Sequence, residues 1–161
     1  GKHETTRACL EYVELLSAEK GDFLDMGCGS GILSIAASLL GFTDVKGFDV
    51  DQEAVDSSIR NAEENNAKVE FFRFGLGAGK SGILKEANTV VANILGPLLI
   101  RFADEICPVA KKNLVISGIL DTLYEEVLSE YVKRGFKEVS RKTIGEWTTG
   151  LLVRAIASDA N

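Results

Sequence analysis

The stretch Phe23-Leu24-Asp25-Met26-Gly27-Cys28-Gly29-Ser30-Gly31-Ile32-Leu33 decides the fold of this chain. Its first residues have the apolar character of a buried strand, its glycines mark a tight turn, and an apolar helix is predicted to follow. Asp49 ends a second strand-like run eighteen residues after Gly31. Glycines let a ligand approach the backbone where a helix begins, and a carboxylate can accept hydrogen bonds from both hydroxyls of a ribose. The arrangement therefore predicts a nucleoside pocket.

The spacing of the glycines indicates which nucleoside. They follow Gly-x-Gly-x-Gly and not the Gly-x-Gly-x-x-Gly of dinucleotide sites. Asp25 lies two residues before them, where a carboxylate would repel a pyrophosphate but would suit the cationic amino-acid end of S-adenosylmethionine. A tight turn also uses glycine for steric reasons alone, so the triplet by itself is weak evidence. With both acids, it predicts S-adenosylmethionine as the cofactor, bound by Asp25, Gly27, Gly29, Gly31 and Asp49.

The bulk composition excludes several other classes of function. The 161 residues suffice for one domain, and no apolar run approaches the roughly 20 residues of a membrane span, so no membrane partner is expected. A net charge of −6 argues against nonspecific binding to nucleic acid. The cysteines, Cys9, Cys28 and Cys107, and the one histidine lack the spacing of metal ligands, so no metal is predicted. Scattered, reduced thiols indicate the cytoplasm.

Helix and strand patterns alternate along most of the chain. A first helix is predicted from the apolar spacing of Thr5, Ala8, Cys9, Tyr12, Val13 and Leu16. Strands are predicted at 23–26, 43–49, 69–74, 89–92 and 114–117, with helices at 30–40, 51–62, 98–106 and 123–132. Residues 136–143 and 149–157 have the pattern of two strands with no helix between them. We therefore predict an α/β fold, a doubly wound, Rossmann-like and mostly parallel sheet of seven strands with a C-terminal antiparallel hairpin, as in class I S-adenosylmethionine-dependent methyltransferases.

A second glycine-rich stretch, residues 75–82, resembles a phosphate loop but lacks its order of residues. The first glycine of that pattern would have to stand at position 74, which is Phe74. We therefore expect a flexible connector here. Phe74 also means that the third strand ends without an acid that could bind the adenine amine.

Several segments resemble the PrmA family of methyltransferases, which modify large-subunit ribosomal protein eleven. In chain order they are Gly1-Lys2-His3-Glu4-Thr5-Thr6, Asp25 to Ser34, Asp49-Val50-Asp51, Val91-Ala92-Asn93-Ile94-Leu95, Ser117-Gly118-Ile119-Leu120 and Glu146-Trp147. They extend over nearly the whole chain, which makes the resemblance more specific than the glycine turn alone. The resemblance implies a methyltransferase that uses S-adenosylmethionine and acts on amino groups of a protein, either a ribosomal-protein lysine or an N-terminal amine.

The resemblance also implies particular site residues. Thr6, Gly27, Asp49 and Asn93 would contact the donor. Asn93 can also orient the acceptor amine as a catalytic residue, although a residue in this place can instead tie down its own loop. His3 is a candidate for acid–base work, with a structural or lid role as the other possibility.

PrmA proteins carry a separate N-terminal domain that presents the ribosomal protein, and this sequence begins inside the first matching segment. We therefore expect residues 1–161 to form one catalytic domain without that presenting domain. Two other functions remain open, namely a methyltransferase for a small molecule and a nucleotide-binding module without catalysis. Trp147 is expected to pack in the hairpin or to line the mouth of the substrate site.

Overall fold

The computed structural model describes residues 2–77 and 84–156 and confirms the predicted alternation of helices and strands. The helices are α1 (Lys2–Leu16), α2 (Ile32–Leu39), α3 (Gln52–Glu64), α4 (Gly96–Arg101), α5 (Ala103–Ile106) and α6 (Asp121–Val132), with a 3-10 turn at Cys107–Val109. The strands are β1 (Phe23–Met26), β2 (Val45–Asp49), β3 (Glu70–Arg73), β4 (Ala87–Asn93), β5 (Ala110–Leu120), β6 (Phe136–Ile144) and β7 (Trp147–Arg154).

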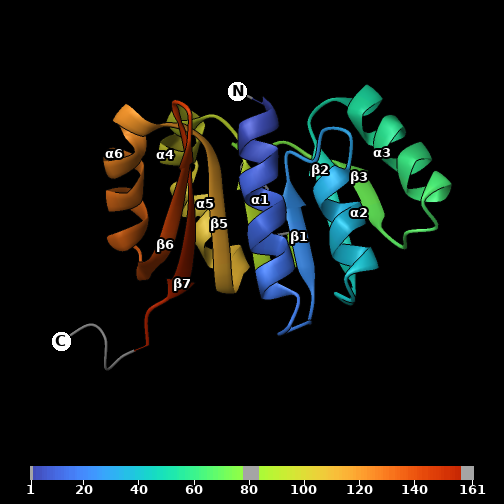
Figure 1. Cartoon of the computed structure of the whole chain (residues 1–161), viewed down its shortest axis with the longest axis horizontal. Coiled ribbons are helices and arrows are strands. Elements are labelled where there is room, and N and C mark those ends of the chain that lie inside the picture. The colour runs from blue at the N-terminus through green and yellow to red at the C-terminus, as the bar shows by residue number, and fades with distance from the viewer. Residues whose placement is uncertain (1, 78–83, 157–161) are drawn as a thin grey trace.

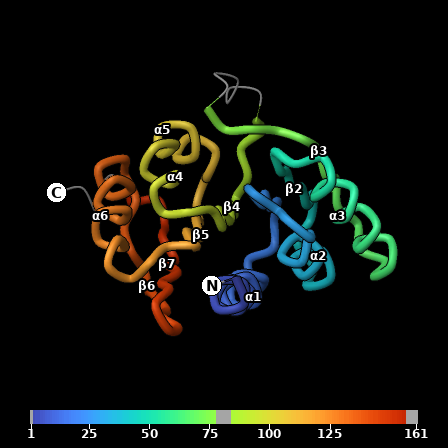
Figure 2. Tube along the Cα trace, turned by 90° about the horizontal axis from the view of Figure 1, so that it is seen from above, coloured from blue at the N-terminus to red at the C-terminus, as the bar shows by residue number. Residues whose placement is uncertain are grey.

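All seven strands lie in one sheet, in the order β3-β2-β1-β4-β5-β7-β6. Strands β1 to β5 are parallel, and β7 is antiparallel to both β5 and β6. Helices α1, α2 and α3 cover one face, and α4, α5 and α6 cover the other, as the view from above in Figure 2 shows. The predicted seven-stranded, mostly parallel sheet with a C-terminal hairpin is thus confirmed.

The order of the strands determines where a ligand can bind. The chain runs outward from β1 through β2 to β3, and then returns to the other side of β1 at β4. The helices that follow β1 and β4 therefore lie on opposite faces, which leaves a crevice at the carboxyl ends of these two strands. Helix α1 begins at this same edge of the sheet (Figure 1).

Most bounds differ from the sequence-based expectation by one to three residues, and the larger differences lie in the second half of the chain. Strand β5 is longer, at Ala110–Leu120, and β7 begins at Trp147 instead of residue 149. The helix predicted at 98–106 is divided at Phe102, whose φ of −104° and ψ of 15° are not helical. These differences arise from pairing between β5 and β7 and from packing of the chain after β4, neither of which changes the periodicity of the sequence.

The face predicted for the first helix is the buried face of α1. Its apolar residues join a core cluster with β1, β2, β4 and β7, on the opposite side of the sheet from the larger cluster around α4 and α6. Tyr12 is 1% exposed, and its hydroxyl lies 2.8 Å from the Ser140 hydroxyl on β6. This contact ties the beginning of the chain to the C-terminal hairpin.

Within residues 2–77 and 84–156, no helix is both long and apolar enough to cross a membrane. Most of the predicted connector at 75–82 lies outside the described residues. Of its described part, Gly77 donates a backbone hydrogen bond of 2.7 Å to a carboxylate oxygen of Glu105.

The buried face of α1 makes a test of the fold possible. Tyr12→Ala should lower the free energy of unfolding by about 3 kcal/mol or more, because it removes a buried ring and leaves a cavity. Leu15→Ala, on the same helix but 63% exposed, should change it by less than about 0.5 kcal/mol. Urea unfolding followed by circular dichroism measures both, and equal effects of the two substitutions would contradict the packing.

Candidate active site

A cavity of about 510 Å³ opens at the carboxyl edge of the sheet. It lies at the ends of β1, β2 and β4, and it is closed by the start of α1, the segment after β3, and the start of β7. The lining residues that the sequence analysis proposed are Thr6, Gly27, Gly29, Asp49, Asn93 and Trp147. Residues from five separate parts of the chain thus meet where the crevice was expected.

The turn from β1 to α2 forms one wall of the cavity. The backbone N–H groups of Gly27 and Cys28 each donate to the carbonyl oxygen of Phe48, at 2.9 Å, which fixes the turn against β2. Gly31, the N-cap of α2, has a φ of +84°, and a Cβ there would lie 3.0 Å from Ser58 and Phe71. Glycine is therefore required by the turn itself at position 31, which does not line the cavity, whereas Gly29 has open space beside it.

The Asp49 carboxylate is held by two backbone groups. One oxygen accepts from the N–H of Gly29 and the other from the N–H of Asp51, both at 3.0 Å. Each carboxylate oxygen has two lone pairs, so each keeps one free for a ligand. The half-buried carboxylate, which lines the cavity, can therefore accept two further hydrogen bonds.

Asp25 lies beside the cavity but is not among its lining residues. Its carboxylate is fully buried on the α2 side of the sheet, where one oxygen accepts from the Ser34 hydroxyl at 2.8 Å. The other oxygen has no hydrogen-bond partner among the described residues. Burial raises the pKa of this carboxyl from 3.8 to about 7, against the opposing effect of the Ser34 hydrogen bond. Direct contact between Asp25 and a donor remains a prediction.

The start of α1 forms another wall of the cavity. Thr5 and Thr6 line the cavity, and so does Lys2, which the sequence analysis did not single out. His3 is exposed on the same turn of the helix and does not line the cavity. The spacing of three and four residues along a helix would have indicated that positions 2, 5 and 6 share one side while position 3 points elsewhere.

The opposite wall is formed by the carboxyl ends of β4 and β5 and by the first residue of β7. Asn93 and Ile94 at the end of β4, Gly118 in β5 and the half-buried Trp147 all line it. Trp147 pairs with Leu120 and thus extends the sheet as far as the cavity.

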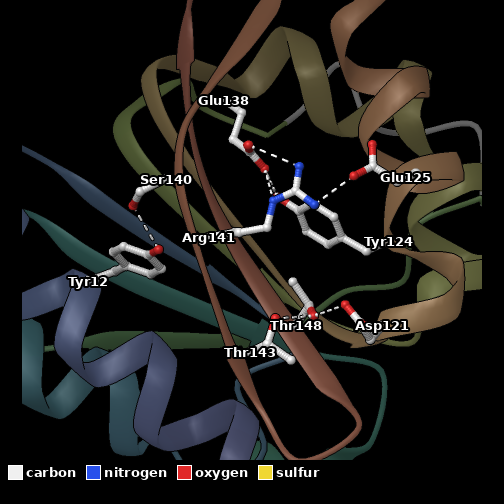
Figure 3. Close-up of polar contacts among 9 residues, drawn as sticks. All are labelled: Tyr12, Asp121, Tyr124, Glu125, Glu138, Ser140, Arg141, Thr143 and Thr148. Atoms are coloured by element: carbon white, nitrogen blue, oxygen red, sulfur yellow. Dashed lines mark hydrogen bonds and ion pairs between the residues drawn. The ribbon is translucent and has the colours of Figure 1, made fainter.

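Polar contacts hold the hairpin that carries Trp147 against α6 (Figure 3). The Thr148 hydroxyl donates to Asp121 at 2.8 Å, and the Tyr124 hydroxyl donates to Glu138 at 2.7 Å. Arg141 bridges Glu138 on its own strand and Glu125 on the helix. These contacts fix the position of β7 and with it the wall of the cavity.

The remaining wall is apolar, and the sequence analysis missed most of it. Its side chains come from the segment after β3 and from the helices after β4, and they are Phe74, Leu76, Leu98 and Phe102. Cys28 also lines the cavity, but burial raises the pKa of its thiol to about 12, so it is not a nucleophile at neutral pH. In the part of the chain that the structure describes, no three His, Cys, Asp or Glu side chains are grouped as metal ligands.

Comparisons with known proteins agree with this geometry. The family model described as ribosomal protein L11 methyltransferase (PrmA) matches residues 1–154. A relative named ribosomal protein L11 methyltransferase, from Dictyoglomus turgidum, is 35% identical over 151 residues, which are 92% of this chain and 50% of the relative. One of the same name from Vibrio campbellii is 41% identical over 133 residues, 81% of this chain and 44% of its own. The chain thus spans about half the length of the curated relatives it matches.

Solved structures show the same fold. A ribosomal protein L11 methylase from Lactobacillus delbrueckii superposes with a TM-score of 0.88 at 24% identity, over 96% of this chain and 80% of that chain. Magnesium protoporphyrin IX methyltransferase from Synechocystis, solved with bound SAH, superposes with a TM-score of 0.77 at 17% identity, over 92% and 83% of the two chains. At these identities the likeness concerns the fold alone.

The buried Asp25 generates a prediction about stability and pH. Between pH 4 and 7 the folded protein holds this proton and the unfolded chain does not, so stability falls as the pH rises through this window and levels off above about 7. The slope from this group is at most about 1.4 kcal/mol per pH unit. Asp25→Asn removes that slope, so the variant should gain stability relative to the wild type between pH 5 and pH 8.

Urea unfolding at several pH values measures this difference, with the exposed Asp56→Asn as the matched control. Stability curves of Asp25→Asn and wild type that run parallel across the whole range would show that the carboxyl titrates normally.

Proposed function

The chain belongs to the PrmA family, and from this premise we propose that it transfers methyl groups from S-adenosylmethionine to amino groups of a protein, with ribosomal protein L11 as the substrate. The observation that carries this proposal is the shape of the cavity. Gly27 and Asp49 border one side and Asn93 and Trp147 the other, so a nucleoside donor and an amine would meet between them.

The cavity suits each part of the donor. Asp49 has lone pairs left for the two ribose hydroxyls, and the open side of Gly29 leaves room for close approach to the backbone. The apolar wall at Phe74 and Phe102 suits the adenine ring, whose faces need no charged partner. Thr6 at the start of α1 can donate a hydrogen bond to the donor carboxylate.

Asp25 lies just before the turn, and its buried oxygen without a partner among the described residues could accept a hydrogen bond from the donor ammonium, although burial raises the pKa of this carboxyl. As a proposal, the donor contacts are therefore Thr6, Gly27, Asp49 and Asn93, and Asp25 interacts with the donor ammonium from its buried position beside the cavity. Gly29 gives access to the backbone, and Gly31 shapes the turn without touching the donor.

The chemistry asks little of the protein beyond positioning. The donor supplies an electrophilic methyl group, and the amine nitrogen bonds to its carbon as the carbon–sulfur bond breaks. The side-chain oxygen of Asn93 can accept a hydrogen bond from the amine, and this contact orients the lone pair of the amine nitrogen toward the methyl group. Deprotonating a lysine at pH 7 costs about 4 to 5 kcal/mol, and the partly apolar cavity offsets this cost by disfavouring the ammonium form. The proton then leaves to solvent, and His3, which does not line the cavity, is not assigned to it.

The wider setting is part of the proposal. The protein substrate is the only partner that we propose, with no nucleic acid or membrane. The three cysteines are free and buried, which fits the reduced state expected of a cytoplasmic protein.

Donor binding tests the first half of the proposal. S-adenosylmethionine should bind in calorimetry, whereas NAD should not. Asp49→Ala should weaken donor binding by about 1.5–3 kcal/mol, because a charged acceptor of two hydrogen bonds is lost. Asp56→Ala, which removes an exposed carboxylate on α3 that does not line the cavity, should bind normally. Micromolar binding of NAD without any response to S-adenosylmethionine would end the methyltransferase proposal.

Methyl transfer tests the second half. Asn93→Ala should lower the rate of transfer to ribosomal protein L11 more than it lowers donor affinity, because its proposed role concerns the amine. Since the relatives are about twice as long, the chain should be compared with a fusion that carries the N-terminal part of the Dictyoglomus turgidum relative. The fusion should transfer faster, because remote substrate contacts help to position the reacting group.

Labelled-methyl incorporation measures the transfer, and Cys28→Ala is the control that should remain active. Efficient transfer to a small amine, with no gain from the fusion, would favour the small-molecule alternative. Donor binding without transfer to any acceptor would favour a module without catalysis.

A further inference from the structure

An irregularity in β5 lies against the end of β4. Strand β5 pairs with β7 as far as Ile116, and the pairing resumes at Ile119 with a shifted register. The two residues between are Ser117 and Gly118. The Ser117 hydroxyl is buried and lies 2.6 Å from that of Thr149, which anchors the irregularity to β7, and Ser117 pairs with Asn93 on the other side.

Gly118 comes unusually close to the chain that leaves β4. Its φ is +83°, a conformation that favours glycine, and a Cβ at this position would lie 2.5 Å from the carbonyl oxygen of Ile94. The same Cβ would lie 3.5 Å from the side-chain oxygen of Asn93. The blocking atom belongs to the backbone and not to a side chain that can rotate away, so any other residue must displace the segment after β4.

The other end of Ile94 meets the donor turn. A Cβ on Gly27 would lie 2.8 Å from Cγ2 of Ile94, and the carbonyl oxygen of Asn93 lies at 3.7 Å from that same position. Ile94 is thus held between two glycines, with its side chain on Gly27 and its carbonyl group on Gly118. The position of Asn93, the preceding residue, is fixed by this arrangement.

We propose that Gly118 and Ile94 are positioning residues, which set the Asn93 side chain at the correct place relative to the donor turn. This inference rests on the proposed function, in which Asn93 orients the acceptor amine and must therefore be placed accurately. Neither residue needs to contact the reacting atoms. A displacement of the order of 1 Å at Asn93 is enough to cost about 100-fold in rate.

The test compares two glycines of similar conformation. Gly118→Ala adds a methyl group against the Ile94 carbonyl, whereas Gly135→Ala, at a φ of +94°, adds one where nothing lies within 4 Å. Both substitutions carry backbone strain, but only the first moves Asn93. With ribosomal protein L11 as acceptor, Gly118→Ala should lower kcat by about 10- to 100-fold relative to Gly135→Ala, and this loss should exceed the loss of donor affinity, as for Asn93→Ala.

A double substitution separates positioning from a general structural effect. If Gly118 acts through Asn93, then Asn93→Ala with Gly118→Ala should be no slower than Asn93→Ala alone. Additive losses in kcat would overturn the proposal, and so would a Gly118→Ala variant as fast as Gly135→Ala.

A readout without catalysis keeps the test independent of the proposed function. The side-chain amide signals of Asn93 in a ¹⁵N–¹H spectrum, assigned by their loss in Asn93→Ala, should shift in Gly118→Ala and not in Gly135→Ala. If the wild type transfers no methyl group, the proposed function fails while this spectrum still decides the positioning. Should Gly118→Ala not fold, Ile94→Ala replaces it, because it only shortens the side chain on Gly27. Unmoved Asn93 signals in that variant would overturn the inference.

Discussion

The hydrogen bonds to the Asp49 carboxylate are the constraint on which the rest of the site depends. One carboxylate ties the turn after β1 to the turn after β2, through the N–H groups of Gly29 and Asp51. Asp51 in turn caps α3, and Ser58 on that helix donates back to the Gly29 carbonyl at 2.8 Å. The donor wall is therefore held by a closed set of hydrogen bonds between side chains and the backbone, which ties the turns after β1 and β2 to the first turns of α3. A site whose groups are already held in place loses less conformational freedom when it binds a ligand.

Much of the architecture could be predicted from the sequence, because the signals concerned are local. The apolar periodicity of α1 and the glycine turn depend on near neighbours in the chain, and each is found as expected. The irregularity in β5 could not be predicted, since it depends on how β5 meets β7 and β4 in three dimensions. The apolar wall was missed for the same reason, because its residues are brought together only by the folding of separate segments.

Asp25 shows where sequence spacing and strand geometry differ. Its distance from the first glycine suggested a ligand contact, yet side chains alternate along a strand, so Asp25 lies on the same face of the sheet as Phe23, beneath the helices. The alternation of side chains along a strand, with a period of two residues, was the signal that could have placed Asp25 on that buried face. Burial raises the pKa of the Asp25 carboxyl, whereas the half-buried Asp49 carboxylate lines the cavity and accepts two backbone hydrogen bonds.

The contact between α1 and the hairpin has a consequence for folding during synthesis on the ribosome. Helix α1 is made before the strands that it covers, and the partners of its buried face include Leu151 on β7, while Tyr12 meets Ser140 across 128 residues of chain. At about 5–20 residues per second, those partners emerge many seconds later. Until then the apolar side of α1 can pack only against the earlier β1, α2, β2, β4 and β5, so the part that meets the hairpin stays uncovered in the nascent chain. The wall that carries Thr6 is thus the earliest part of the site to be translated and among the last to be completed.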